Sequence, residues 1–535
     1  MITTEGDVHP PDTAWGEGAF VTAIEEALIH GRIDIAVHSA KDLPTDERPE
    51  LEIGAYLPRE APGDVLVFRA GGPAASSLDE VERGARVGTD SPRRTAFLRA
   101  VRPDLRFHQL HGNVDTRLRR LDERQTDLLV LAEAGLSRLG RSDRVSVRLP
   151  AELVPPAPGQ GALAVQVRAG DADVRRSVAV LDDRVTHRAV AIERAILAGT
   201  GGGCRAPVGA VATIDEEGIR VVAGFARPDG GLRAIVERRT TADPDGHDAD
   251  DRLVAGVLAD LVRDASAAAR RAGDPRILVT RAAAQAAPLA LALVDQGLAP
   301  ILVPAIEIVD ADGGPLADAA ARLADFDWVL VTSINAADAI GRLVAAKRGP
   351  AGSPGAAGPH WAAVGSATSR ALRARGIRVS FQPRQAAAAA LVATVPIAAG
   401  DRVLLPRSDI ADPGLVDGLR ERGAIVESVV AYRTIEAPES SVPLLGEAIG
   451  HGLAATILSS GSTARGLVSL AARVEGGSRI LALPTVCIGP ETAGEARRLG
   501  YRIEDVSASP APRSIAEITA RLLARQTDRE TTDAD

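Results

Sequence analysis

Cys204 is one of only two cysteines in the chain, and it lies in the glycine-rich stretch GTGGGCRAPVG at residues 199–209. Glycine gives up side-chain packing and costs backbone entropy, so a run of glycines indicates positive φ angles or the close approach of another group. A cysteine on such a loop is within reach of a bulky ligand. Taken alone, the pattern also fits an ordinary loop that happens to contain a cysteine.

The stretch HSAKDLPT at residues 38–45 places Ser39, Lys41 and Asp42 at the end of a predicted strand. An aspartate after a strand commonly caps a helix or a turn, which is one interpretation of Asp42. The carboxyl ends of strands are also where open α/β sheets bind their ligands. The three side chains are therefore candidates for a ligand site.

Four arginines stand near predicted helices that follow strands. The segment GTDSPRRTAFLR begins a helix with Arg93 and Arg94, LHGNVDTRL brings Arg117 into the next helix, and LSRLG adds Arg138. The helix dipole favours acidic residues in a first turn, so arginines there indicate an anionic partner. A solvated basic face is the alternative. Together with Asp42 and Cys204, the arginines imply a ligand that carries many carboxylates and is attached covalently.

Alternating strands and helices must position these residues. Strands are predicted at 33–40 and 162–168, a strand running into a helix at 127–140, an amphipathic helix at 186–199, and a hairpin around PDGG at 221–240. An Ala-rich helix end followed by Gly and Pro marks a domain boundary near residue 272.

From residue 276 onward the sequence contains an internal repeat with an offset of about 125 residues, long enough to be a duplicated half-domain. The matching pairs are RILVTR (276–281) with RVLLPR (402–407), 328–340 with 455–467, and 364–379 with 488–503. Two strand-like segments, LVPAIEIV (302–309) and VVAYRTIE (429–436), are predicted to pair as a hinge between two similar lobes. A cleft between lobes is a common ligand site.

The bulk composition limits the classes of function. The chain has 535 residues, so several domains are expected, and its net charge of −9 argues against bulk binding of nucleic acid. Two cysteines make no disulfide framework and lack metal-site spacing, so no metal is expected and a reducing compartment fits. No apolar run is long enough for a membrane span and the N-terminus has no apolar signal, which together predict a cytoplasmic protein.

Residues 1 to about 270 resemble the hydroxymethylbilane synthase family, also called porphobilinogen deaminase. The resemblance rests on IAVHSAKDLP, GTDSPRRTAFL, HGNVDTRL, PGQGALAV and GGGCRAPVG. It implies a dipyrromethane cofactor bound covalently through Cys204, and Asp42 as the catalytic residue that stabilises the cation formed as ammonia leaves. It also implies that the acetate and propionate groups of the cofactor and substrate are bound by Ser39, Lys41, Arg93, Arg94, Arg117 and Arg138.

Residues 274 to about 525 resemble the uroporphyrinogen-III synthase family through LVTR, WVLVTSINA, VVAYRT, LSSGSTARGL and CIGPETA. The resemblance implies that Tyr432 assists loss of the hydroxyl from hydroxymethylbilane; a packing aromatic at the hinge is the alternative for this residue. It further implies carboxylate binding by Ser333, Ser460, Ser462, Thr463 and Thr492. Cys487 lies in the strand-like TVCIG and is predicted to be a buried, inert side chain.

The two resemblances together predict an α/β protein: two periplasmic-binding-protein-like domains and a small α+β domain, followed by a two-lobe synthase half. The expected boundaries are 1–60 with 158–178 (deaminase domain 1), 61–157 (domain 2), 179–272 (domain 3), 274–309 with 434–525 (synthase lobe 1), 310–433 (lobe 2) and 526–535 (a disordered tail).

The sequence departs from the deaminase family in three places. The family's opening strand and helix, with an Arg-x-Ser motif, have no counterpart before TTEGD, so domain 1 is expected to be incomplete. Glu17 stands where a lysine is usual and His111 where an arginine is usual. Because the last two changes remove positive charge from an anion site, they raise the possibility of an impaired deaminase.

The leading interpretation is a monomeric, bifunctional enzyme acting on porphobilinogen and then on hydroxymethylbilane, with small molecules as its partners and neither nucleic acid nor membrane. A synthase with an inactive deaminase-like scaffold is the first alternative. A non-catalytic binding protein for polyanionic tetrapyrroles is the second.

Overall fold

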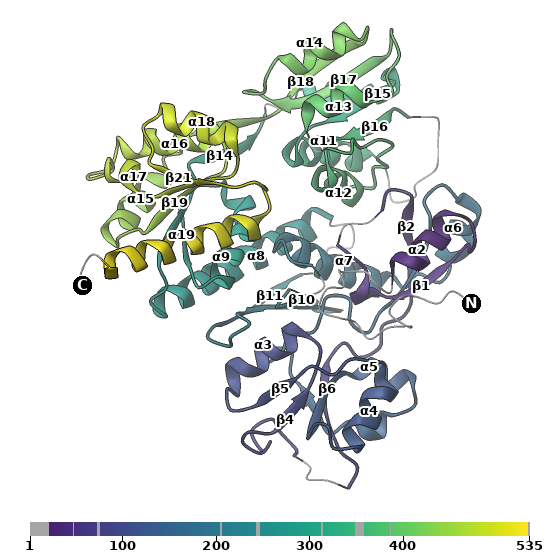
Figure 1. Cartoon of the computed structure of the whole chain (residues 1–535). Coiled ribbons are helices and arrows are strands. Elements are labelled where there is room, and N and C mark those ends of the chain that lie inside the picture. Colours follow the sequence, from purple (N-terminus) through teal and green to yellow (C-terminus); the bar gives the residue numbers. More distant parts are fainter. Residues whose placement is uncertain are drawn as a thin grey trace. The chain divides into compact units, whose positions relative to one another are not determined.

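The computed structural model describes residues 21–45, 48–71, 75–203, 206–241, 247–311, 314–347, 358–385 and 387–532. The chain forms two compact units (Figure 1). The first comprises residues 1–303, 444–464 and 475–535, and the second comprises 304–443 and 465–474. Among the described residues, no helix has the length and apolarity needed to cross a membrane.

Two sheets and their helices make up the first part of unit 1. An antiparallel sheet has the order β1-β8-β2, and a mixed sheet has the order β5-β4-β6-β3-β7. The strands are β1 (Ala36–Ser39), β2 (Leu51–Tyr56), β3 (Asp64–Phe68), β4 (Arg86–Gly88), β5 (Arg106–His108), β6 (Leu128–Ala132), β7 (Val147–Leu149) and β8 (Leu163–Arg168). The helices are α2 (Thr22–Ile29), α3 (Pro92–Val101), α4 (Val114–Asp122), α5 (Glu133–Arg138) and α6 (Ala172–Ala179), with short 3-10 turns η1 (Ala40–Asp42) and η2 (Ser142–Arg144).

A third, antiparallel sheet follows, with the order β11-β10-β9. Its strands are β9 (Val208–Asp215), β10 (Gly218–Ala226) and β11 (Arg233–Thr240), and the helices α7 (Arg184–Gly199) and α8 (His247–Arg271) pack on it. The predicted hairpin around PDGG is confirmed, and Gly230 in its turn has a φ of +79°.

The rest of unit 1 is a parallel sheet with the order β13-β12-β19-β20-β21. Its strands are β12 (Arg276–Val279), β13 (Ala299–Leu302), β19 (Ala455–Leu458), β20 (Thr485–Cys487) and β21 (Ile503–Val506). The associated helices are η3 (Ala283–Gln285), α9 (Ala287–Asp295), α15 (Ser441–Gly450), α16 (Gly461–Ala471), α17 (Arg479–Ala482), α18 (Pro490–Arg498) and α19 (Pro512–Thr532); α15 and α16 reach into unit 2.

Unit 2 contains a sheet with the order β14-β18-β17-β15-β16. Its strands are β14 (Ile306–Asp310), β15 (Trp328–Val331), β16 (His360–Ala363), β17 (Arg402–Ser408) and β18 (Ile425–Glu436). Its helices are α10 (Gly314–Ala321), η4 (Leu323–Asp325), α11 (Ile334–Lys347), α12 (Ser366–Ala374), α13 (Ala388–Thr394) and α14 (Gly414–Glu421). The predicted pairing of the two hinge segments is confirmed, because β14 and β18 are antiparallel neighbours.

The sequence repeat corresponds to equivalent positions in these last two sheets. The three neighbouring strands β12-β19-β20 of one sheet correspond in order to the three neighbouring strands β17-β15-β16 of the other. Each repeat therefore contributes strands to both sheets: β12 and β15 come from the first repeat, β17 and β19 from the second.

Three boundaries differ from the expectations. β14 and the end of β18 lie in the sheet of unit 2, so residues 306–309 and 434–436 belong with lobe 2 and not with lobe 1. Helix α19 continues to Thr532, where a disordered tail was expected from residue 526. Gln526, Arg529 and Glu530 favour a helix, but the three threonines and the aspartate of this segment do not, so local propensity alone does not explain the extension.

Candidate active site

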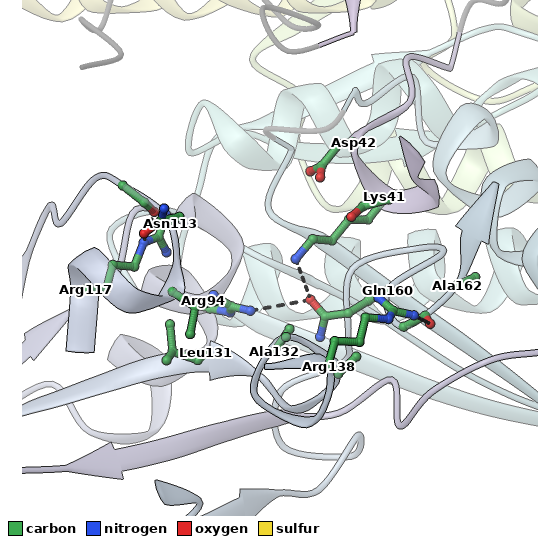
Figure 2. Close-up of a pocket in the computed structure, with 16 residues that line it drawn as sticks. Lys41, Asp42, Arg94, Asn113, Arg117, Leu131, Ala132, Arg138, Gln160 and Ala162 are labelled. Carbon is green, nitrogen blue, oxygen red and sulfur yellow. Dashed lines mark hydrogen bonds between the residues drawn. The ribbon is translucent and has the colours of Figure 1, made fainter. Parts of the chain in front are cut away.

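A cationic pocket of about 390 Å³ lies between the first two sheets of unit 1 (Figure 2). Its charged lining consists of four cations and one carboxylate: Lys41, Arg94, Arg117, Arg138 and Asp42. Ser39, Asn113 and Gln160 add neutral polar groups. The structure thus brings together six of the residues predicted for the deaminase site, including the catalytic candidate Asp42.

The turn η1 positions Lys41 and Asp42 at the end of β1. The Ala40 N–H donates to the Ala162 carbonyl over 3.0 Å, which ties this turn to the start of β8. Lys41 Nζ donates to Gln160 Oε1 over 3.4 Å (Figure 2). Burial lowers the pKa of Lys41 to about 8, and the charge of Asp42 only partly opposes this effect. Lys41 is therefore a cation whose charge depends on pH close to neutrality.

Arg117 and Arg138 reach the pocket from α4 and α5. The Asn113 side chain caps α4 by accepting from Thr116 N–H over 2.9 Å. Arg117 Nε donates to the Gly112 carbonyl over 2.7 Å, and Arg138 Nη2 donates to the Gly161 carbonyl over 2.6 Å. Burial lowers the pKa of Arg117, an effect that the charge of Arg94 reinforces. Both guanidinium groups are fixed at one nitrogen and line the pocket.

Arg93 and Arg94 share a buried carboxylate, Asp64, at the start of β3. Arg94 Nη2 lies 2.7 Å from Asp64 Oδ1, and Arg93 Nη2 lies 2.8 Å from Asp64 Oδ2. Arg93 Nη1 also donates to the Pro155 carbonyl over 2.6 Å. Burial alone would raise the pKa of Asp64, but the two arginines outweigh it and hold that pKa well below its usual range. Arg94 lines the pocket, whereas Arg93 is not among the lining residues.

Gln160 connects the pocket to this ion triad. Its side-chain amide donates to Asp64 Oδ1 over 2.9 Å and to the Pro62 carbonyl over 2.7 Å, while its oxygen accepts from Lys41 and Arg94. The flanking Gly161 has a φ of +89°, and a Cβ there would lie 2.4 Å from the Glu60 carbonyl oxygen. Only glycine can take this backbone conformation so close to the Glu60 carbonyl. The glycines of PGQGA therefore help to fix the position of Gln160.

His111, which stands where the family usually has arginine, forms a hydrogen bond with Asp90. His111 Nδ1 lies 2.5 Å from Asp90 Oδ2. Neither residue is among those that line the pocket, although Gly112 is. The change from arginine therefore comes with a local acidic partner. Glu17, the other departure, lies outside the described residues.

Cys204, the predicted cofactor attachment site, also lies outside the described residues. The segment before it is described: α7 ends at Gly199, and Gly201 has a φ of +71°. The second cysteine, Cys487, is fully buried in β20, and burial raises the pKa of its thiol to about 11. The predicted burial of Cys487 is confirmed.

The hydroxyl residues predicted for the synthase half lie at helix starts. Ser333 Oγ accepts from the Ala336 N–H over 3.1 Å, and Ser460 Oγ accepts from the Thr463 N–H over 3.1 Å. Ser460 Oγ also lies 2.8 Å from Ser462 Oγ. Thr463 is buried and donates to the Ser460 carbonyl, and Thr492 is buried in the first turn of α18. Capping occupies part of their hydrogen-bonding capacity, and their role toward carboxylates stays a prediction.

Tyr432 lies in β18, opposite Asp310 of β14. Its side chain belongs to the hydrophobic core of unit 2 and is 9% exposed. This position fits the interpretation of Tyr432 as a packing residue. Only a small part of its side chain is accessible for a catalytic role. Its assistance to hydroxyl loss stays a prediction.

Sequence reasoning missed Asp64, Gln160 and Asn113. Gln160 lies in the motif PGQGALAV, which contributed to the family resemblance without a role for the glutamine. Asp64 begins an apolar strand, a position where an acidic residue needs a buried partner, and that was the available signal. Among the residues that the structure describes, no group of three or more His, Cys, Asp or Glu side chains is arranged to hold a metal ion.

Comparison with known proteins assigns families to both parts of the chain. Models described as the dipyromethane cofactor binding domain and the C-terminal domain of porphobilinogen deaminase match residues 1–176 and 187–253. The model of uroporphyrinogen-III synthase HemD matches residues 287–517.

Two relatives agree with the deaminase models of the first part. The porphobilinogen deaminase of Roseiflexus castenholzii is 42% identical over 275 residues, which cover 51% of this chain and 87% of that protein. The one from Mycobacterium marinum is 48% identical over 222 residues, 41% of this chain and 69% of that protein. A structure of uroporphyrinogen III synthase from Thermus thermophilus aligns over 47% of this chain and 99% of its own, with 17% identity and a TM-score of 0.34.

Proposed function

Because the chain belongs to the porphobilinogen deaminase family and continues into a domain that matches the uroporphyrinogen-III synthase family, we propose that it is a bifunctional enzyme of tetrapyrrole biosynthesis. Its first part joins four porphobilinogen molecules into hydroxymethylbilane with release of ammonia. Its second part closes hydroxymethylbilane to uroporphyrinogen III. The observation that carries the first activity is the pocket in which four cations surround the single carboxylate of Asp42.

The residues of this pocket fit a dipyrromethane cofactor. A dipyrrole with carboxylate side chains needs several cations. Arg117, Arg138, Arg94 and Lys41 offer them on a wall where, among the described lining residues, Asp42 is the one acidic group. When bound, the cofactor supplies the primer to which pyrrole units are added. Cys204 is the proposed attachment point, since Cys487 is buried and its thiol pKa is raised.

Asp42 is the proposed catalytic residue. Its exposed carboxylate lines the pocket, where it can accept from pyrrole N–H groups and stabilise the positive charge that develops as ammonia leaves the substrate. Lys41, Arg117 and Arg138 hold carboxylates and so orient the reacting carbon atoms. A charge pair at about 4 Å is worth roughly 4 kcal/mol at an effective dielectric of 20. Asp42 is expected to lower the activation free energy of the reaction by an amount of this order.

The test of the proposed function uses the two cysteines as a matched pair. Cys204→Ala should abolish formation of hydroxymethylbilane from porphobilinogen and remove the mass of two pyrrole units from the intact protein. Cys487→Ala should retain both. Both variants should convert supplied hydroxymethylbilane to uroporphyrinogen III. A wild-type chain that lacks the added mass and the deaminase activity would contradict the bifunctional assignment and favour the inactive-scaffold alternative.

For the second activity, Tyr432 is proposed to assist loss of the hydroxyl group. Tyr432→Phe keeps the buried ring and removes only the phenol. The variant should close hydroxymethylbilane more slowly, so that more of it cyclises spontaneously without inversion to uroporphyrinogen I. The measurement is the ratio of isomers III and I from preformed hydroxymethylbilane. An unchanged rate and ratio would leave Tyr432 as a packing residue.

A further inference from the structure

Helix α9 of the synthase part is buried on two sides. Ala290, Leu291 and Val294 belong to the hydrophobic core formed by β9, β10, β11, α7 and α8 of the deaminase part. Leu289 and Leu293 belong to the core formed with β12, β19 and α19. A helix with apolar residues on every face is usually buried on every face. Helix α9 accordingly lies between the sheet β11-β10-β9 of the deaminase part and the sheet β13-β12-β19-β20-β21 of the synthase part. Figure 1 shows α8 and α9 next to one another, and the two helices are in contact.

The same two helices approach the glycine segment 199–203 that directly precedes Cys204. A Cβ on Gly199 would lie 2.3 Å from Leu258 Cδ1 of α8, and a Cβ on Gly201 would lie 2.8 Å from Pro288 Cβ of α9. Gly201 also needs its positive φ of +71°. The segment therefore consists of glycine partly because a residue of the synthase part packs against its backbone.

Pro288 is well suited to fix this backbone. It stands in the first turn of α9, where a proline loses no helical hydrogen bond and its ring is rigid. An ion pair ties the same two parts together nearby: Arg227, after β10, donates from Nη1 to Asp274 Oδ2 over 3.0 Å, just before β12. Both side chains are mostly buried, so the junction between the deaminase and synthase parts is fixed and not a loose linker.

We propose that α9 of the synthase part is a positioning element for the deaminase reaction, acting through contact of Pro288 with Gly201. The deaminase part of this chain thus depends on a residue outside its own family match. The proposal rests on the proposed function, since the glycine segment next to Pro288 directly precedes Cys204, the proposed attachment point of the cofactor.

The test compares three variants of the full-length chain. Pro288→Gly removes the contact, Pro288→Ala keeps the Cβ that lies nearest to Gly201, and Pro512→Gly makes the same change in the first turn of α19. Pro288→Gly should lower the deaminase kcat about tenfold with an unchanged KM for porphobilinogen, since misplacing a reacting group by about 1 Å is costly. Pro288→Ala should keep most of the activity, and Pro512→Gly should match the wild type. Deaminase kinetics of Pro288→Gly equal to those of Pro512→Gly would overturn the proposal.

Two further measurements separate this inference from its premise. Hydrogen exchange in a peptide covering residues 199–203 should be faster in Pro288→Gly than in Pro512→Gly, and this readout does not depend on activity. Gly201→Ala should also lower kcat, and combining it with Pro288→Gly should cost less than the sum of the two single changes because the clash is relieved. Additive effects or unchanged exchange would contradict the contact, whereas a wild type without deaminase activity would contradict only the proposed function.

Discussion

At the scale of the residue, the pocket is defined by one acidic group among cations. Asp42 is exposed to the pocket, while the buried carboxylate of Asp64 is paired with Arg94, which lines the pocket, and with Arg93, which does not. The pocket therefore presents positive charge to carboxylates and a single negative charge to a developing cation. This division of labour fits a reaction in which an anionic substrate forms a cationic centre.

Asp42→Asn should lower the deaminase kcat by about three orders of magnitude, since roughly 4 kcal/mol of charge stabilisation is lost. The amide keeps the size of the side chain, and Asp42 is exposed at the pocket and not packed in the core. The thermal midpoint should therefore stay within about 1 °C of the wild type, an expectation for a surface change with no effect on packing. A variant that loses activity together with several degrees of thermal midpoint would show a structural role instead.

The deaminase KM for porphobilinogen should rise as the pH increases through about 8. Lys41 has a pKa of about 8 and is charged below that pH, so its hold on a carboxylate weakens above it. The measurement is KM between pH 7 and 9.5 for the wild type and for Lys41→Arg. Arginine stays charged over this range, so the variant should lose the rise near pH 8. The same rise in both proteins would assign the titration to another group.

At the scale of the element, the Asp64 triad ties α3 to β3 and to the chain at Pro155. Arg93→Leu should lower the free energy of unfolding by about 3–5 kcal/mol, because it leaves the buried Asp64 with only one guanidinium. Arg99→Leu on the same helix, where the arginine donates to the Pro228 carbonyl, lies over the Phe107 ring and pairs with no buried carboxylate among the described residues, should cost less than about 1 kcal/mol. Urea denaturation measures both. Lost turnover with unchanged stability in Arg93→Leu would instead support the carboxylate-binding role implied by the family resemblance.

Elements with local signals were predictable from the sequence. The strand that runs into a helix at 127–140 appears as β6 and α5, and the helix 186–199 appears as α7. The motifs also placed Lys41, Asp42 and Arg117 in one site. The burial of Arg93 was not predictable, because its partner Asp64 is distant in sequence and begins an otherwise apolar strand. Likewise, the Ala- and Leu-rich sequence of α9 reveals that the helix is buried but not that two different sheets bury it.

At the scale of the whole molecule, the deaminase and synthase parts share one hydrophobic core through α9. Leu291→Ala, at a side chain that is 3% exposed, should cost about 2–5 kcal/mol and lower the thermal stability of both activities together. The measurement is residual deaminase and synthase activity after heating. Leu391→Ala, fully buried in the core of unit 2, is the control and should lower the synthase activity alone. Loss of synthase activity alone in Leu291→Ala would argue that the two parts unfold separately.

Because each of the two synthase sheets contains strands from both sequence repeats, neither sheet can be completed until the second repeat has been translated. β12 cannot pair with its neighbour β19 until β19 has been translated. About 150 residues separate the end of β13 from the start of β19. At about 5–20 residues per second, a ribosome needs roughly 8–30 s to translate them. During that interval one edge of β12 has no partner strand. The deaminase's third sheet, already complete, offers α9 a finished apolar surface from the moment it emerges. In this gene order, the first enzyme can act as a template on which the second begins to fold.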